Sequence, residues 1–174
     1  MHQKELARSD CPEMRSAAAF LILMSNCDVK ATRFARLSTL TSKEEAISYI
    51  QNHCIPHPYF RSICINDRCI GCVFIAPEKG EDRCRAEIGY GLALDYWGKG
   101  ITTRAAKIAL SEGFKQFPDL VRIQAHVEVD NKASQRVLEK LGFQREGLLR
   151  KFTYNKGAIR DLFMYSLLST EFIA

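Results

Sequence analysis

The hydrophobic positions along this chain change their spacing several times, and each spacing predicts a different element. Apolar residues three and four apart, such as Ala105, Ile108 and Ala109, predict a helix over residues 102–116. A further helix is predicted over residues 133–141. Short apolar runs between turn residues predict strands. These strands cover residues 61–66, 69–76, 85–94, 121–129, 144–154 and 159–168.

Capping and helix-breaking residues set the limits of the first elements. Ser42 and Glu45 form a capping box, in which the serine accepts from the backbone of the glutamate. This box predicts a helix that runs to about Asn52 and is ended by Pro56. Residues 12–25 are also predicted to be helical, although they show little clear periodicity.

The order of the elements predicts a mixed sheet. Short connections at residues 66–68 and 155–157 predict an antiparallel hairpin near each end. Between them, a strand, a helix and a strand predict one βαβ crossover. The fold class is therefore α+β, with a central βαβ core flanked by antiparallel hairpins. A chain of 174 residues fits a single domain, residues 1–174.

Composition and charge exclude several classes of protein. Hydrophobic residues make up 47% of the chain and charged residues 26%, as in ordinary soluble proteins. The longest apolar stretch, residues 17–24, is too short to cross a membrane, and no signal-peptide pattern is present. The predicted location is the cytoplasm, with the nucleus also open. A net charge of +5 without a run of lysines and arginines predicts no nucleic-acid partner.

The cysteines and histidines predict no metal site. Seven scattered cysteines, an odd number, favour reduced thiols. Cys69 and Cys72 have the spacing of a metal-binding pair, but a strand would point side chains three positions apart to opposite faces. His53 and His57 are spaced for one helix face, but Pro56 lies between them.

A glycine loop predicts an anion site. The strand over residues 85–94 runs towards Gly98-Lys99-Gly100, and a helix follows. Glycines let the backbone approach a ligand, and the N–H groups at the start of a helix favour a phosphate. A dinucleotide fingerprint would need glycine at position 103, where Thr103 stands, and no Walker loop is present. The alternative is that the turn only needs the backbone freedom of glycine.

Three blocks, in order, resemble a known family. They are residues 86–90 (Ala-Glu-Ile-Gly-Tyr), 96–101 (Tyr-Trp-Gly-Lys-Gly-Ile), and 131–134 (Asn-Lys-Ala-Ser) leading to 138–143 (Leu-Glu-Lys-Leu-Gly-Phe). The chain is similar to the GCN5-related N-acetyltransferases (GNAT), in the branch of ribosomal-protein N-acetyltransferases such as RimJ and RimL, and most of all to uncharacterised plant members. The resemblance covers about residues 41–168, whereas residues 1–40 fit poorly. It implies the acyl-CoA N-acyltransferase fold, with acetyl-CoA as co-substrate.

The resemblance also implies where coenzyme A binds. The family loop reads Gln/Arg-x-x-Gly-x-Gly/Ala, and Trp97 and Thr102 depart from its first and last positions. The backbone at residues 92–94 is implied to bind the pantetheine arm as an added strand. The implied cofactor-binding residues are Leu92, Ala93, Leu94, Trp97, Gly98, Lys99, Gly100, Ile101, Thr102, Arg104, Asn131 and Ser134. Lys99 and Arg104 would contact phosphates, or equally be solvated surface charges.

Amide formation from a thioester benefits from a base that takes the proton of the amine. The resemblance implies Glu87 as this base. The alternatives are a structural carboxylate at Glu87, or His126 as the base. Thr153 stands where other members of the branch carry a base, and it cannot serve. Leu138 replaces the tyrosine acid of many members, which leaves Ser134 as the candidate acid or, alternatively, as a helix cap.

The leading hypothesis is an N-acetyltransferase that acts on a primary amine, either a protein N-terminal α-amine or a small molecule. The alternative is a regulatory module that binds acyl-CoA without turnover. The sequence does not predict the oligomeric state.

Overall fold

A six-stranded mixed sheet organises the part of the chain that this computed structural model describes, residues 33–35, 42–66 and 68–173. Its strands are β1 (Phe60–Ile65), β2 (Arg68–Pro77), β3 (Arg85–Leu92), β4 (Arg122–Glu128), β5 (Gln144–Asn155) and β6 (Ala158–Leu168). The order across the sheet is β1-β2-β3-β4-β6-β5. Strands β3 and β4 are parallel, and the other neighbours are antiparallel. The predicted βαβ core between two hairpins is therefore confirmed.

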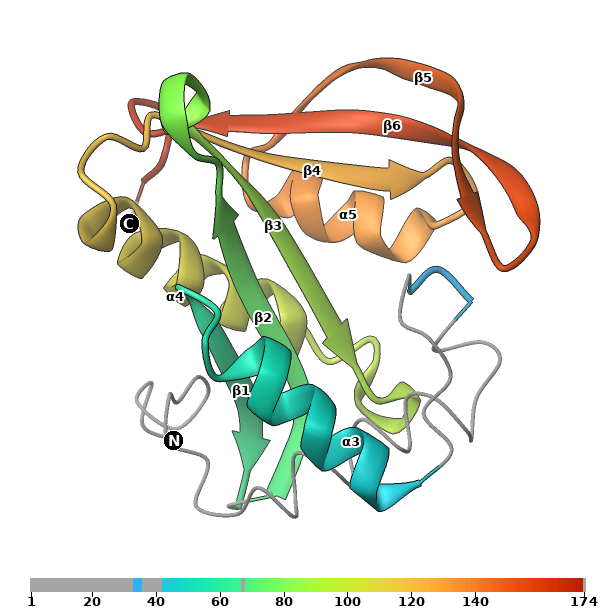
Figure 1. Cartoon of the computed structure of the whole chain (residues 1–174). Helices are drawn as coiled ribbons and strands as arrows, with labels where there is room; N and C mark the ends of the chain where they lie inside the picture. Colours follow the sequence, from blue (N-terminus) through green and yellow to red (C-terminus); the bar gives the residue numbers. More distant parts are fainter. Residues whose placement is uncertain (1–32, 36–41, 67, 174) are drawn as a thin grey trace.

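Within the described residues, three α-helices pack on the two faces of this sheet (Figure 1). They are α3 (Lys43–Tyr49), α4 (Ile101–Gln116) and α5 (Lys132–Lys140). In Figure 1, α4 and α5 lie behind the sheet, and α3 lies in front of β2 and β3. Within the described ranges, no helix is long and apolar enough to cross a membrane. The predicted helix over residues 12–25 lies outside the described residues.

The capping box predicted the start of α3 correctly. Ser42 Oγ accepts a hydrogen bond of 3.1 Å from the backbone N–H of Glu45. After Tyr49 the helix continues as one π-helical turn over Ile50–Cys54. The helix thus ends shortly before Pro56, as the proline predicted.

Alternation along the strands gives the sheet one apolar face and a second face that is apolar at β1 and β2, where Phe60 stacks on Phe74, and polar at β3 and β4. The apolar face belongs to one core with α4 and α5, which includes Val73, Ile75, Ile88, Ala106, Ala109, Leu110, Ile123, Ala125, Val127 and Leu138. Burial of each large aliphatic side chain contributes roughly 1.5–3 kcal/mol. On β4 the positions between the core residues hold Gln124 and His126, which are only partly buried. The polar side chains of β4 therefore lie on the face opposite α4 and α5, which is called the polar face below.

The expectation that Cys69 and Cys72 point to opposite faces is wrong. The register between β1 and β2 shifts after Ile63, so that Cys64 faces Cys69 and Ile70 is the extra residue of a bulge. The bulge breaks the alternation, and Cys72 packs against the cluster that contains Cys69. Burial raises the pKa of the Cys72 thiol to about 12, which disfavours the thiolate that metals bind. Among the described residues, no group of three or more His, Cys, Asp or Glu side chains could hold a metal ion.

A charged pair connects the outer strand β5 with the start of β4. The Arg122 guanidinium donates two hydrogen bonds to the Glu146 carboxylate, at 2.7 and 2.5 Å. Ser166 of β6 lies between them in the sheet and donates a third, at 2.6 Å. The bonds from Arg122, and then the one from Ser166, lower the pKa of Glu146 to about 2.

We expect Glu146→Gln to lower the free energy of unfolding by about 0.5–1 kcal/mol at pH 7, because the pair is partly exposed and screened by water. The folded-state pKa lies below the ordinary value of 4.5. The stabilisation is therefore complete above that value and is lost as the pH falls towards 2. Urea denaturation of both proteins at pH 7 and pH 3 measures this difference. An equal difference at the two pH values would contradict an ionic origin.

Candidate active site

Strands β3 and β4 are paired only at their starts. Three residue pairs join them: Arg85 with Arg122, Ala86 with Ile123, and Glu87 with Gln124. Each strand then continues with its outer neighbour, β3 with β2 as far as Leu92 and β4 with β6 as far as Glu128. Figure 1 shows the two strands starting together and diverging towards their carboxyl ends. The predicted site residues follow these diverging ends.

The glycine loop leads into α4 with the geometry of an anion site. Gly98 has φ of 74° and Gly100 has φ of 71°, both left-handed, and a Cβ at either position would meet no atom within 4 Å. Gly100 is the N-cap of α4, and no side chain caps this end. The first N–H groups of the helix, from Ile101 onward, have no intrahelical acceptor. An exposed helix start of this kind suits a phosphate.

Two residues of the loop make contacts that the sequence did not predict. The indole Nε1 of Trp97 donates to the backbone carbonyl of Leu92 at 2.8 Å. Lys99 Nζ donates to the carbonyl of Asp95 at 3.0 Å and lies 5.4 Å from the centre of the Tyr96 ring. Lys99 is thus folded back on the loop, whereas Arg104 on the first turn of α4 is exposed.

Most of the backbone polar groups at residues 92–94 have partners within the chain. The carbonyl of Leu92 accepts from Trp97, and the N–H of Ala93 donates to the Ile70 carbonyl at 2.9 Å. The carbonyls of Ala93 and Leu94 accept from the N–H groups of the turn that follows them. An added strand would therefore compete for these groups rather than find them unpaired.

Across the opening, α5 begins with Asn131 and Ser134. Asn131 is the N-cap of α5, and its Oδ1 accepts from the backbone N–H of Ser134 at 3.1 Å. The capping role considered for Ser134 therefore belongs to Asn131. The Ser134 hydroxyl lies 2.8 Å from the hydroxyl of Tyr90, which comes from β3. Leu138, one helical turn further on, lies fully buried in the core.

Tyr90 was not among the predicted site residues. It lies three positions after Glu87 on β3, so the two side chains point to opposite faces of the sheet. Burial raises the pKa of the Tyr90 phenol above its usual range. Alternation along β3 could have predicted that Tyr90 and Glu87 point to opposite faces. It could not have predicted that Tyr90 contacts Ser134, because that contact depends on how α5 packs.

On the polar face, Glu87 pairs with His126 of β4. Glu87 Oε1 lies 3.1 Å from His126 Nδ1, with 40% of the glutamate side chain exposed and 13% of the histidine. A carboxylate can only accept, so the facing ring nitrogen carries the proton, and Nε2 is the basic nitrogen of the neutral ring. The ring of Phe152 from β5 stacks on His126, with centroids 5.3 Å apart and planes 15° apart. Glu87 and His126 were predicted as alternatives, and they are in contact.

Phe152 reaches His126 because β5 departs from β6. The register between these strands shifts between Leu149 and Thr153. Within this segment Lys151 has φ of 50°, and its N–H donates to Asp161 Oδ1 at 2.7 Å. A positive φ at a non-glycine residue is often found at functional sites.

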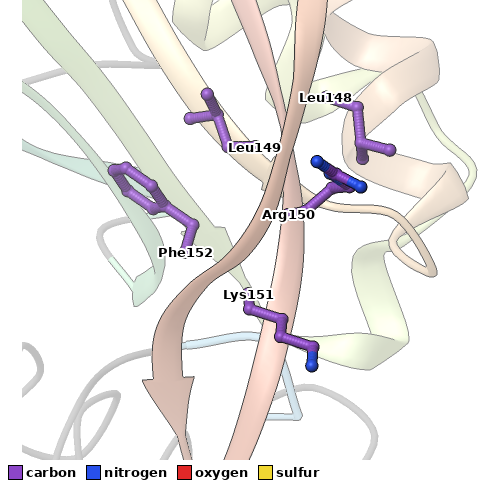
Figure 2. A pocket seen from close by; sticks show the side chains of 5 residues that line it. All are labelled: Leu148, Leu149, Arg150, Lys151 and Phe152. Carbon is purple, nitrogen blue, oxygen red and sulfur yellow. The ribbon is translucent and has the colours of Figure 1, made fainter.

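A shallow surface cavity of about 610 Å³, open to solvent, lies at this bulge and is lined by Leu148, Leu149, Arg150, Lys151 and Phe152, of which all but Leu149 are exposed. Figure 2 shows Leu149 and Phe152 on one side of the strand, with Leu148 and Arg150 on the other. Phe152 therefore belongs both to the lining of the cavity and to the contact with His126. The sequence showed no signal for this cavity, because it depends on the bulge.

Comparisons with known proteins agree on one family. The acetyltransferase (GNAT) domain family matches residues 10–144. The chain is 36% identical to the uncharacterised N-acetyltransferase YoaA of Bacillus subtilis (strain 168) over 159 residues, 88% of each protein. It is 42% identical to the uncharacterised N-acetyltransferase p20 of Bacillus licheniformis over 92 residues, 53% of this chain and about half, 51%, of that relative.

Solved structures give the same result. Mycobacterium smegmatis RimJ in complex with CoA-disulfide aligns with a TM-score of 0.73 and 27% identity, over 91% of this chain and 80% of that chain. RimL, a ribosomal L7/L12 α-N-protein acetyltransferase, aligns with a TM-score of 0.72 and 25% identity, over 92% and 85%.

The chain therefore belongs to the GNAT family of acetyltransferases. This confirms the predicted family, its fold and the use of acetyl-CoA as co-substrate. The relatives named here are bacterial, and the resemblance to plant members stays a prediction, as do the roles of the individual site residues.

We expect Gly100→Ala to weaken coenzyme A binding about tenfold, because the new methyl group would stand in the open space before the helix start. The left-handed φ also costs about 1–2 kcal/mol of stability. Calorimetric titration with coenzyme A and urea denaturation measure the two effects.

Gly157→Ala is the matched control. Gly157 has φ of 78°, with no atom within 4 Å of an added Cβ, and it lies in the hairpin turn between β5 and β6. It should lose similar stability and keep full affinity. Equal loss of affinity in both variants would show that Gly100 acts only through stability.

Proposed function

We propose that this protein transfers the acetyl group of acetyl-CoA to a primary amine by direct attack in a ternary complex, with residues 1–174 acting as one domain. One observation carries the proposal. The Glu87–His126 pair lies where β3 and β4 stop pairing, and beyond this point β3 leads to the glycine loop and β4 to the start of α5 with Ser134. Groups suited to taking the proton of the amine and to supporting the leaving sulfur thus lie at the same opening.

In this proposal the glycine loop holds the phosphates of the co-substrate. The N–H groups from Ile101 and Thr102 would donate to a phosphate, with the exposed Arg104 close by on the same turn. Lys99 would have to leave the Asp95 carbonyl to join them. The pantetheine arm would run past residues 92–94 towards the opening. Acetyl-CoA supplies there an acetyl group activated as a thioester.

The Glu87–His126 pair is proposed to remove a proton from the amine. An amine is protonated at neutral pH and must lose a proton before it can attack. Glu87, the more exposed member of the pair, is the proposed base, and His126 holds it by the 3.1 Å contact. The alternative within the same pair is that Glu87 orients His126, and that Nε2 of the ring takes the proton.

Ser134 is proposed to support the leaving sulfur of coenzyme A. Its hydroxyl can donate a hydrogen bond to a thiolate, whereas the apolar Leu138 cannot. A thiol with a pKa of about 8.5 leaves readily without strong acid assistance, so a hydroxyl donor is sufficient.

For the acceptor, we favour the α-amine of a protein N-terminus. The similarity to RimL, named as an α-N-protein acetyltransferase, supports this class. The cavity at the β5 bulge supports it too, because Phe152 both lines that cavity and stacks on His126, so a peptide bound there would extend from the Glu87–His126 pair along β5.

The test is thiol release from acetyl-CoA with a set of acceptors at pH 6–9. The set contains peptides with a free N-terminus, the same peptides acetylated at the N-terminus, spermidine and small primary amines. We expect release with the free peptides and not with the blocked ones. Faster release with spermidine than with any peptide would instead assign a small-molecule acceptor. No amine-dependent release, with coenzyme A binding intact, would favour a binding module without turnover.

We expect Glu87→Gln to lower kcat by a factor of about 10²–10⁴ without weakening coenzyme A binding, because a general base contributes about this much. His126→Gln should lower kcat less if Glu87 is the base, and equally if His126 is the base. His53→Gln, at an exposed histidine of the π-helical turn, is the control and should keep full activity. Full activity of Glu87→Gln would remove this residue as base or orienting group.

A further inference from the structure

The hydroxyl of Tyr90 contacts two atoms of Ser134. It lies 2.8 Å from Ser134 Oγ, and it is also within hydrogen-bond distance, 3.3 Å, of the Ser134 backbone carbonyl. The two residues are 44 positions apart in sequence. They lie on the two sides of the opening, because β3 and β4 have no residue pair beyond Glu87 and Gln124. The Tyr90 side chain therefore connects β3 with the start of α5, the helix that follows β4.

The surroundings of Tyr90 hold it in place as a neutral phenol. Its ring packs against the main hydrophobic core. Burial raises the pKa of its hydroxyl above the usual range, although the bond to Ser134 acts in the opposite direction. The phenol therefore keeps its single proton to donate at neutral pH.

The acceptor of the Tyr90 proton determines which way the Ser134 hydroxyl can donate its own proton. If Tyr90 donates to Ser134 Oγ, the proton of the serine hydroxyl is directed elsewhere and can be donated to a ligand. If Tyr90 donates to the Ser134 carbonyl instead, the serine proton points at the phenol oxygen. Asn131 accepts from the backbone N–H of Ser134 and thereby holds the first turn of α5, whereas Tyr90 contacts the Ser134 hydroxyl itself.

We infer that Tyr90 is the positioning residue of the leaving-group step, an inference that rests on the proposed acetyl transfer. Tyr90 donates its proton to Ser134 Oγ and so frees the serine proton for the sulfur of coenzyme A. In the transfer, the lone pair of the amine forms the bond from nitrogen to the acetyl carbon. The bond from carbon to sulfur breaks, and its electron pair stays on sulfur, where the Ser134 hydroxyl donates a hydrogen bond. Before the attack the ammonium gives one proton, through the Glu87–His126 pair, to water. The nitrogen gives its second proton to the same pair once its bond to carbon has formed, and the sulfur later takes one from water.

The kinetic test uses Tyr90→Phe, which keeps the ring in the core and removes only the hydroxyl. We expect kcat to fall about tenfold, with little change in the KM for acetyl-CoA. The reason is that Ser134 stays in position, but its O–H bond is no longer oriented towards the sulfur. The double variant Tyr90→Phe/Ser134→Ala should be no slower than Ser134→Ala alone, because Tyr90 acts through Ser134. An acetyl thioester with a more acidic thiol should reduce the effect, because its sulfur needs less support.

Tyr165→Phe is the matched control. Tyr165 is buried in the same core, and its hydroxyl donates to Glu139 of the same helix α5 at 3.4 Å. The variant removes a phenol hydroxyl that bonds to α5 at Glu139 rather than at Ser134. This variant should keep kcat and show the same dependence on the thiol as the wild type.

A binding test needs no acceptor and no turnover. The affinities of coenzyme A and of desulfo-coenzyme A, which lacks the sulfur, are compared by calorimetry at pH 7 and pH 9. The wild type should prefer coenzyme A, and more so at pH 9, where the thiolate forms. Tyr90→Phe should reduce this preference about as much as Ser134→Ala does, whereas Tyr165→Phe should keep it.

The outcomes separate the two proposals. If the wild type shows this preference and Tyr90→Phe reduces it, but no amine leads to thiol release, the proposed function is overturned and only the support of the sulfur by Tyr90 through Ser134 stands. Equal affinities for the two compounds in the wild type would overturn the inference about Tyr90. So would a double variant in which the two losses of kcat multiply.

Discussion

The arrangement of this site depends on the early separation of β3 from β4. Two parallel strands that stop pairing inside a sheet would leave unpaired backbone groups, which is costly when they are buried. Here each strand stays paired on its outer side, β3 with β2 and β4 with β6, so both remain regular while they diverge. The opening is thus a property of the whole sheet. Glu87, Tyr90 and the glycine loop lie along one of its edges, and His126, Asn131 and Ser134 along the other.

At this opening, the candidate base and the candidate support for the leaving group lie on different faces of the sheet. Alternation along β3 sends Glu87 to the polar face and Tyr90 to the face of α4 and α5, and β4 does the same with His126 and its core neighbours. In the proposed reaction, the proton of the amine would leave on one face while the sulfur is supported on the other. The contact between Trp97 and the Leu92 carbonyl adds a further constraint, because any ligand that takes the place of a strand beside residues 92–94 must replace it.

Two local irregularities show where reasoning from an ideal strand stops. The bulge at Ile70 brought Cys69 and Cys72 to one cluster, although strict alternation separates them. The bulge in β5 places Phe152 on His126, so an aromatic wall reaches the polar face from the outermost strand. Gly71 directly follows the bulge at Ile70, whereas residues 150–152 of β5 contain no glycine or proline that would predict the bulge there.

The sequence by itself determined the order and the limits of the elements in the described ranges, and the family. Capping at Ser42, the glycines of the loop and hydrophobic spacing act within a few residues, so they can be read without a fold. It also named Glu87, His126, Asn131 and Ser134 singly. Only the tertiary structure decided which of them meet. The contact of Glu87 with His126 spans 39 positions, and that of Tyr90 with Ser134 spans 44. Such contacts depend on register and on helix packing, where a shift of one residue would turn each side chain to the other face.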